Sequence, residues 1–489
     1  MKRILSKVFC FVFILIFVIT FISCSSGKGN MNMSDGYYED FTNSEEEYLD
    51  LVETGFVDTS VNNKVNVSLD SSTAAYSNIR KLINMNSRID KNAVNIEQML
   101  NYFNYSYENK SEEQLTSFME LSSCPWNSEN HLLSVAIKAK DFEIEKKRPN
   151  NFVFLLDVSG SMNSADKLPL MINSFKLLVD NLNDNDRISI VTYAGSNKVL
   201  LDGGYGHEKT KIDAIITDLY AGGSTAGSGG IKKAYEICSK YYIEGGNNRV
   251  FLATDGDFNV GISTTSGLKD FISKERESGI YLSVFGFGRG NLHSSTMDTL
   301  AQAGNGNYHY IDSLLEARKV FVSELGGTLQ TVAKDAKVQV EFSDSVEKYR
   351  VIGYENKRLT DEEFDNSETD AGEIGAGHVT VCLIEVKLKS QNPSDYFAKC
   401  TVRYKDVLDS EMSKEVVSKC FAINNNPSND FIFQAAVAEF GLILRDSQYK
   451  GTSDIESMVE RINKVEIMQD SYKKEFMELA LKYLETYIK

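Results

Sequence analysis

The sequence predicts an α/β protein with a central, doubly wound and mostly parallel sheet. An α+β region precedes this sheet, and a β-rich domain that ends in helices follows it. Between residues 151 and 332, short apolar runs alternate with segments of helical spacing, as in a parallel sheet covered by helices on both faces. After residue 333, apolar and polar residues alternate within the predicted strands, which is typical of antiparallel strands with one face exposed to solvent. A chain of 489 residues also exceeds one ordinary core and predicts several domains.

The first predicted strand of the central domain, at 152–156, is a continuous apolar run, as expected for a strand that is buried on both faces. The helix expected at 167–181 carries Leu170, Phe175 and Leu178 on one side. Strands are expected at 152–156, 187–193, 250–253, 281–287 and 307–311, and further helices at 212–219, 231–241, 268–276, 293–303 and 314–328.

Two flanking regions surround this central domain. The N-terminal region, 65–148, predicts strands at 65–69 and 132–137 and helices at 74–85 and 94–103. The C-terminal domain, 333–489, predicts an antiparallel sheet or a sandwich, followed by helices. Its strands are expected at 337–342, 349–353, 378–388, 397–404 and 415–422, and its helices at 431–444, 455–463 and 472–488. We expect the two regions to pack together around an inserted domain at 151–332.

The first residues have the layout of a secretory signal. A basic start is followed by an apolar run at 9–22 and by small residues around Cys24. The sequence Phe21-Ile22-Ser23-Cys24 resembles a bacterial lipobox, which implies that Cys24 is lipidated and becomes the first residue after cleavage. The alternative is an uncleaved membrane anchor, although the run is short for a membrane span. Both interpretations place the protein outside the cytoplasm.

In the lipobox interpretation, residues 1–23 form a lipoprotein signal peptide. Residues 24–64 are polar and acidic, with few apolar side chains to bury, and predict a flexible tether. The protein is then exported and anchored by its N-terminal lipid to the bacterial cell membrane or envelope.

Charge and motifs exclude several classes of function. A net charge of -17 repels phosphate backbones and argues against nucleic acid as a partner. The seven cysteines form no CxxC pair, so zinc or thioredoxin-like chemistry has no local support. The sequence has no G-x-S-x-G, H-E-x-x-H, G-x-G-x-x-G or P-loop pattern. We therefore expect no enzyme activity and no small-molecule cofactor.

Oxygen-bearing side chains gather where the predicted strands of the central domain end. The first strand runs into Asp157, which opens a D-x-S-x-S pattern with Ser159 and Ser161. Thr225 follows a Gly-Gly turn, and Asp255 follows a later strand. In open α/β sheets, ligands bind at the carboxyl ends of the strands. Carboxylates and hydroxyls are hard ligands, which favour one divalent cation: Mg²⁺ first, with Mn²⁺ or Ca²⁺ as alternatives.

This set of residues resembles the metal-ion-dependent adhesion site of von Willebrand factor A domains, a Rossmann-like fold. The resemblance implies that Ser159, Ser161 and Thr225 touch the metal directly, while Asp157 and Asp255 hold it largely through water. It also implies an open coordination position that an Asp or Glu of a partner protein fills.

A longer resemblance covers residues 65–489. Segments that support it include Cys124-Pro125-Trp126-Asn127 and the stretches at 75–80, 99–103, 156–162, 254–261, 352–356, 370–378 and 435–444. They are similar to a bacterial family of A-domain lipoproteins of the YfbK-like type, which carry a C-terminal domain of unknown function.

Three functions remain open. The first is a lipid-anchored module that binds a protein through the metal. The second is an envelope assembly or scaffold protein that uses the same A domain for contacts within the envelope. The third, and the least supported, is an enzyme with its activity in the C-terminal domain.

Overall fold

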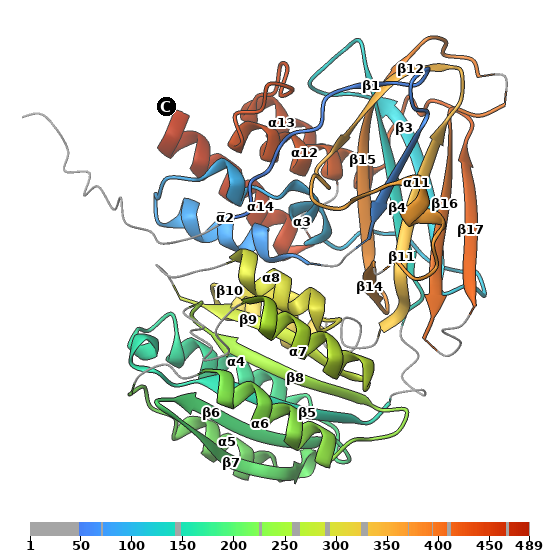
Figure 1. Cartoon of the computed structure of the whole chain (residues 1–489). Coiled ribbons are helices and arrows are strands. Elements are labelled where there is room, and N and C mark those ends of the chain that lie inside the picture. Colours follow the sequence, from blue (N-terminus) through green and yellow to red (C-terminus); the bar gives the residue numbers. More distant parts are fainter. Residues whose placement is uncertain are drawn as a thin grey trace, which may run out of the picture. The chain divides into compact units, whose positions relative to one another are not determined.

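A six-stranded sheet forms the centre of the domain expected at residues 151–332, which we call the A domain after the domains that it resembles (Figure 1). The computed structural model describes residues 48–69, 72–141, 148–223, 227–256, 265–288, 294–323, 331–369, 371–393, 395–407, 412–465 and 469–488. The strand order is β10-β9-β8-β5-β6-β7. The parallel strands are β5 (Asn150–Asp157), β6 (Arg187–Ala194), β8 (Asn247–Thr254), β9 (Ile280–Phe287) and β10 (Tyr308–Ile311), and β7 (Ser196–Tyr205) is an antiparallel edge strand. The expected doubly wound, mostly parallel sheet is confirmed.

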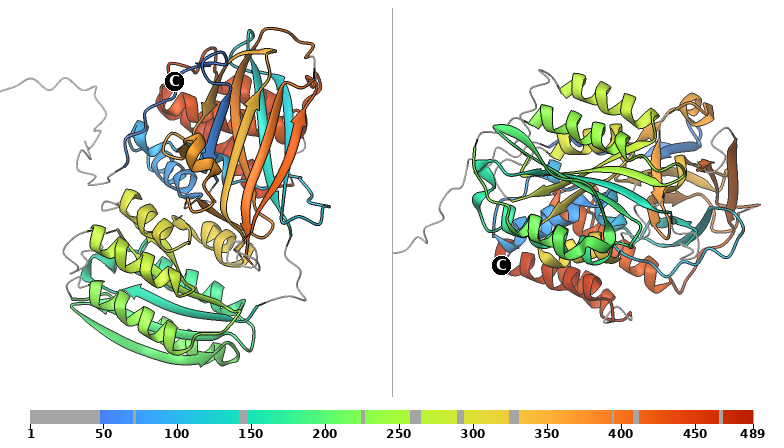
Figure 2. Two further views of the ribbon diagram at one scale, coloured as in Figure 1. Left: turned by 45° about the vertical axis from the view of Figure 1, so that its right-hand side comes forward. Right: turned by 90° about the horizontal axis from the view of Figure 1, so that it is seen from below.

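Helices cover both faces of this sheet (Figure 2). Alternate residues of β5 enter different cores: Phe152 and Phe154 pack in one, and Val153 and Leu155 in the other. This two-sided burial explains the continuous apolar run. The first core also takes side chains from α4 (Leu168–Asp180), α5 (Lys209–Thr217) and α9 (Leu314–Arg318). The second takes them from α6 (Gly227–Lys240), α7 (Thr265–Glu277) and α8 (Ser294–Ala303).

The regions before and after the A domain share their sheets. One antiparallel sheet has the order β1-β12-β15-β4-β3, and the other has the order β13-β2-β11-β16-β17, with β14 also paired to β11. The early strand β2 (Lys64–Ser68) pairs with β11 (Thr331–Phe342), and β4 (His131–Ala139) pairs with β15 (Val379–Leu388). The other strands are β1 (Val57–Asp58), β3 (Leu115–Ser123), β12 (Val346–Ile352), β13 (Arg358–Leu359), β14 (Gly372–Gly375), β16 (Ala398–Asp406) and β17 (Ser413–Cys420). Figure 2 shows the blue strand β2 among orange strands from the C-terminal part.

An apolar core shared by these two sheets makes them a sandwich. The A domain is therefore inserted between β4 and β11 of a body that both flanking regions build, which we call the flanking body. This is the packing that the strand and helix signals on both sides of the A domain indicate.

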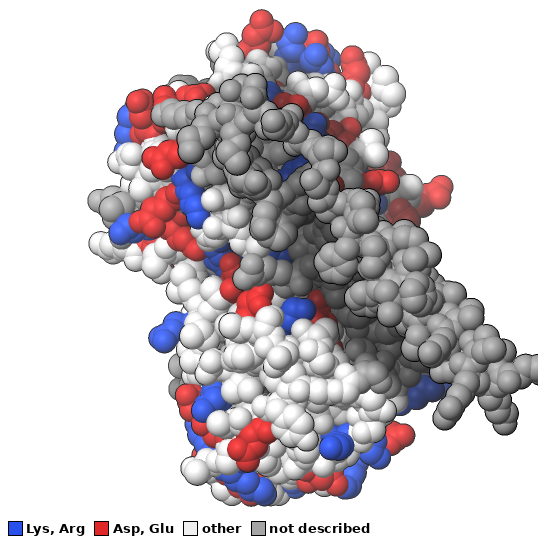
Figure 3. All heavy atoms as spheres, turned by 90° about the vertical axis from the view of Figure 1, so that its left-hand side faces the viewer, with Lys and Arg blue, Asp and Glu red and all other residues white. Residues whose placement is uncertain are grey.

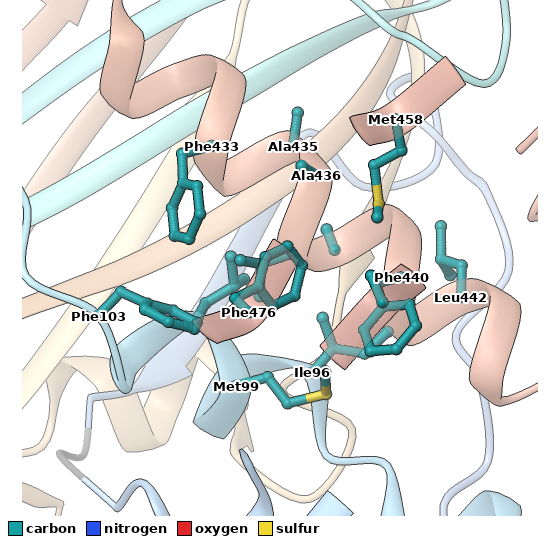
Figure 4. Close-up of a cluster of buried hydrophobic side chains, with 14 of the residues drawn as sticks. Ile96, Met99, Phe103, Phe433, Ala435, Ala436, Phe440, Leu442, Met458 and Phe476 are labelled. Atoms are coloured by element: carbon teal, nitrogen blue, oxygen red, sulfur yellow. The ribbon is translucent and has the colours of Figure 1, made fainter. Parts of the chain in front are cut away.

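Helices from both ends of the chain pack together beside the sandwich. Phe103 follows α3, and its ring centroid lies 4.9 Å from that of Phe433 in α12 and 5.6 Å from that of Phe476 in α14 (Figure 4). These helices are α2 (Ala74–Asn84), α3 (Ile96–Asn101), α12 (Asn429–Leu444), α13 (Ile455–Ile462) and α14 (Ser471–Tyr483). Shorter helical turns lie at Lys91–Ala93, Gly160–Asn163, Gly206–Glu208, Lys319–Ser323, Asp361–Asp365 and Leu484–Ile488. Among the helices that the structure describes, none is long and apolar enough to cross a membrane.

A buried carboxylate ties the Cys124–Asn127 segment to the sheet. Glu385 of β15 accepts hydrogen bonds from Trp126 Nε1 at 3.4 Å, from Asn130 Nδ2 at 2.7 Å and from Arg350 Nη2 at 2.7 Å. A buried carboxylate needs such partners, because water no longer solvates it. This segment therefore has a structural role in joining the two halves of the flanking body.

A second buried ion network joins the flanking body to the A domain. Arg80 of α2 is buried and donates to Asp312 at 2.5 and 2.8 Å, to Glu316 of α9 at 2.7 Å and to Glu475 of α14 at 3.0 Å. The hydroxyl of Tyr102 accepts from Arg80 and donates to Glu316 at 2.8 Å. One guanidinium thus connects three parts of the chain that are far apart in sequence.

Candidate metal site at the carboxyl edge of the A-domain sheet

Two expected acidic residues lie at the ends of neighbouring strands. Asp157 is the last residue of β5, and Asp255 follows β8, which pairs with β5 in parallel. Both residues are buried, with exposures of 0% and 1%. The structure thus brings these carboxylates to the same edge of the sheet. Thr225 and Cys24, which the sequence also indicates as site residues, lie outside the described residues.

The D-x-S-x-S segment folds into a tight turn around Asp157. The carboxylate accepts a hydrogen bond from the backbone N–H of Ser159 at 2.9 Å and one from the hydroxyl of Thr254 at 3.2 Å. The hydroxyl oxygens of Ser159 and Ser161 lie 2.9 Å apart. The two serines of the motif therefore present their oxygens as a pair beside the end of β5.

Glycines allow the loop before α6 to lie against this turn. The backbone N–H of Gly222 donates to the carbonyl of Val158 at 2.8 Å, and that of Gly160 donates to the carbonyl of Gly223 at 3.0 Å. Gly223 has a φ of +87°, a conformation that favours glycine. The chain that leads to Thr225 is thus held beside the D-x-S-x-S turn as far as residue 223.

The electrostatics of the site call for a cation. Burial raises the pKa of Asp157 to about 6, and the negative charge of Asp255 adds to this rise. Two carboxylates buried this close together need a positive charge nearby. One is present: Lys167 Nζ donates to Asp255 Oδ2 at 2.8 Å.

The donor set fits a hard divalent cation. Asp157, Ser159, Ser161 and Asp255 offer only oxygen, the ligand that Mg²⁺ and Ca²⁺ prefer. Within the described part of the chain, no three His, Cys, Asp or Glu residues gather into a metal-binding group. The candidate site is not such a group, because two of its four described residues are serines, which offer hydroxyl oxygens.

A hollow of about 430 Å³ lies beside the candidate site. It shares Val158, Gly222 and Gly223 with the loops described above, and Leu200 and Tyr220 also line it. The side chain of Tyr220 is 76% exposed. A large exposed aromatic residue next to a hollow is a common feature of protein-binding surfaces.

Lys167 is the residue of this site that the sequence analysis missed. It lies in the segment expected to be helical, and its position six residues after Ser161 gives no signal of a contact with Asp255. Only the fold, which places the start of α4 beside the end of β8, brings the two together.

Family models match three parts of the chain. The model described as "Uncharacterized protein YfbK, C-terminal" matches residues 327–485, "von Willebrand factor type A domain" matches 151–322, and "von Willebrand factor" matches 42–134. The uncharacterized protein YfbK of Escherichia coli (strain K12) is 41% identical over 409 residues, which cover 78% of this chain and 71% of the relative.

Solved structures include similar chains. A von Willebrand factor type A protein from Catenulispora acidiphila has a TM-score of 0.43 and 15% identity, and the match covers 77% of this chain and 91% of that one. The ArnB paralog VWA2 from Sulfolobus acidocaldarius has a TM-score of 0.37 and 15% identity, with coverage of 76% and 98%.

Proposed function

We propose a function from the premise that the chain belongs to the YfbK family and carries a von Willebrand factor type A domain. In this proposal, the chain captures an acidic side chain of a partner protein through a divalent cation. A domains are in general protein-interaction modules, and their family often binds such a cation. The partner and the use of the cation in this chain are parts of the proposal.

The observation that carries the proposal is the pair of buried carboxylates beside the paired serine hydroxyls. Ser159, Ser161 and Thr225 would hold the cation directly, and Asp157 and Asp255 would hold it largely through water. Two carboxylates roughly neutralise a divalent ion, while neutral hydroxyls leave it able to attract a further oxygen ligand. A carboxylate of the partner is the ligand that this arrangement favours. Mg²⁺ is the proposed ion, with Mn²⁺ and Ca²⁺ as alternatives.

The surface near the site supports contact with a protein. Leu200 and Tyr220 are exposed large hydrophobic residues beside the candidate site. Figure 3 shows that uncharged side chains predominate on the lower half of the visible face, with a few Lys, Arg, Asp and Glu side chains among them. Exposed large apolar and aromatic side chains such as these are typical of the central part of a protein interface.

The proposed location is outside the cytoplasm. In this proposal, Cys24 carries lipid and the chain is anchored to the cell membrane or envelope. The structure corrects the bounds of the expected tether at 24–64: β1 pairs with β12, and Ser447 Oγ donates to Glu53 Oε1 at 2.6 Å, so residues 48–64 belong to the flanking body. The rest of the expected tether, residues 24–47, lies outside the described residues. Several acyl chains are needed for stable anchoring, and bacterial lipoproteins as a class carry more than one.

A scaffold role in the envelope is the second candidate. The Arg80 network favours it, because a buried guanidinium with three carboxylate partners fixes the A domain to the flanking body. A fixed A domain suits a protein that holds other envelope components in a defined geometry. In both candidates the chain acts by binding and has no enzyme activity.

The experiment uses the whole chain, in detergent, as bait against solubilised envelope extract, with Mg²⁺ or with EDTA. The control is the Asp157→Ala/Ser159→Ala variant, with its fold checked by circular dichroism. We expect a partner that is retained only with Mg²⁺ and only by the unmodified chain. A partner retained equally by the variant, or equally in EDTA, contradicts the metal-dependent mechanism. The scaffold role predicts that the partner is itself a component of the envelope.

A further inference from the structure

The ammonium of Lys167 lies beside Asp255, one of the two carboxylates that would hold the proposed cation. Its ammonium lies 2.8 Å from Asp255 Oδ2, and the two side chains are 11% and 0% exposed. The residue directly precedes α4, so its backbone is tied to the first turn of that helix: the N–H of Met171 donates to the Lys167 carbonyl at 2.8 Å. This buried ion pair uses one of the two carboxylates of the candidate metal site.

The end of β9 is shaped around the stem of this lysine. Gly288 has a φ of +78°, and a Cβ at this position would lie 2.2 Å from Lys167 Cγ and 2.5 Å from Cε. The carbonyl of Gly288 accepts a hydrogen bond from the hydroxyl of Tyr310 at 2.5 Å, which holds the turn in place. The lysine therefore lies in a formed slot, and its contact with Asp255 is not a chance surface pairing.

We propose that Lys167 is an internal counter-ion that competes with the divalent cation for Asp255 and so sets the cation affinity of the site. This inference rests on the proposed function. Without the cation, the ammonium neutralises one buried carboxylate and keeps the site folded. When the cation arrives, it must displace the ammonium or bind beside a positive charge in a poorly solvated place. Either event weakens binding, because like charges repel strongly where water is scarce.

A purely structural role for Lys167 makes a different prediction. In that case its loss lowers stability and leaves the cation affinity unchanged. In the competitor role, its loss raises the affinity, and the cation replaces the missing positive charge. The melting temperature of a lysine-free variant then depends on the cation much more than that of the unmodified chain.

The test titrates MnCl₂ and MgCl₂ alone into the whole chain in detergent, by isothermal titration calorimetry. Lys167→Met is expected to bind the cation at least about tenfold more tightly, as expected when a like charge leaves a buried site. Lys167→Arg keeps the charge and must not show this gain. The matched control is Lys176→Met, on the solvent side of the same helix, where Lys176 pairs with Asp213 at 3.3 Å. This control is expected to bind as the unmodified chain does.

The outcomes separate this inference from the proposed function. If Lys167→Met binds no more tightly than the unmodified chain, while Asp157→Ala abolishes binding, the competitor role is overturned and the metal site stands. If Asp157→Ala binds the cation as the unmodified chain does, the proposed metal site itself is overturned. If Lys167→Met fails to fold without cation and gains its structure on addition of MnCl₂, seen by circular dichroism, the competitor role is supported.

Discussion

The substitution Arg80→Met removes the charge that joins the A domain to the flanking body. Arg80 is buried, and its partners Asp312 and Glu316 are buried as well. Removal of one member of a buried pair leaves an uncompensated charge and costs about 3–5 kcal/mol. Glu475 is partly exposed and adds little, because solvent screens its pairing. We therefore expect Arg80→Met to lower the free energy of unfolding by about 3–5 kcal/mol.

Urea denaturation, followed by tryptophan fluorescence, measures this loss. Trp126 is the single tryptophan of the chain and is buried in the flanking body, so its emission reports on unfolding of that body. The variant Arg80→Met/Glu316→Gln also removes one of the stranded carboxylates, so it is expected to recover about 1 kcal/mol or more. The exposed pair of Lys91 and Asp446 supplies the control Lys91→Met, expected within about 0.5 kcal/mol of the unmodified chain. A loss below about 1 kcal/mol for Arg80→Met would refute the reasoning.

Three further predictions concern other parts of the chain. Burial, with the charge of Glu355, raises the pKa of Glu97 from 4.5 to about 7, so the folded state holds this proton more tightly than the unfolded chain does. The stability contributed by this group is therefore present at low pH and is lost as the pH rises through about 7. Glu97→Gln is expected to raise the free energy of unfolding at pH 8 by on the order of 1–3 kcal/mol and to leave it nearly unchanged at pH 4. Urea denaturation at both pH values measures this difference. A larger gain at pH 4 than at pH 8 contradicts this sign. Tyr220→Ala is expected to weaken partner capture about tenfold with unchanged Mn²⁺ affinity, since an exposed aromatic anchor contributes about 1–2 kcal/mol to binding. The control is Tyr242→Ala, because Tyr242 is also exposed. Unchanged capture by Tyr220→Ala would show that the hollow is not part of the interface. Cys24→Ser is expected to abolish incorporation of labelled fatty acid, and labelling that persists rules out Cys24 as the lipidated residue.

The central sheet was predictable because its strands are buried on both faces. Five mainly apolar or aromatic segments were expected as strands, and each corresponds to a parallel strand of the structure. The edge strand β7 was missed, because seven of its ten residues, including Val199 and Leu200, are exposed and carry no apolar run or clean alternation. β3 was missed as well, since polar residues interrupt its sequence.

Long-range polar contacts were beyond the reach of sequence reasoning. Arg80 lies 232 residues from Asp312 along the chain, and local spacing carries no information about such a pair. The motif residues Asp157 and Asp255 were found because both directly follow predicted strands of a parallel sheet, whose carboxyl ends share one edge. Lys167 follows no strand, and its role depends on the slot at Gly288.

The most direct test of the central claim is the position of the metal itself. Crystals of the whole chain grown with MnCl₂ would show the ion by its anomalous scattering. The account predicts one peak at the carboxyl edge of the A-domain sheet, within about 2.3 Å of the hydroxyl oxygens of Ser159 and Ser161, close to the distances of hard cations from oxygen ligands. Mn²⁺ bound elsewhere, with Lys167 still paired to Asp255 and no ion beside the serines, would contradict it.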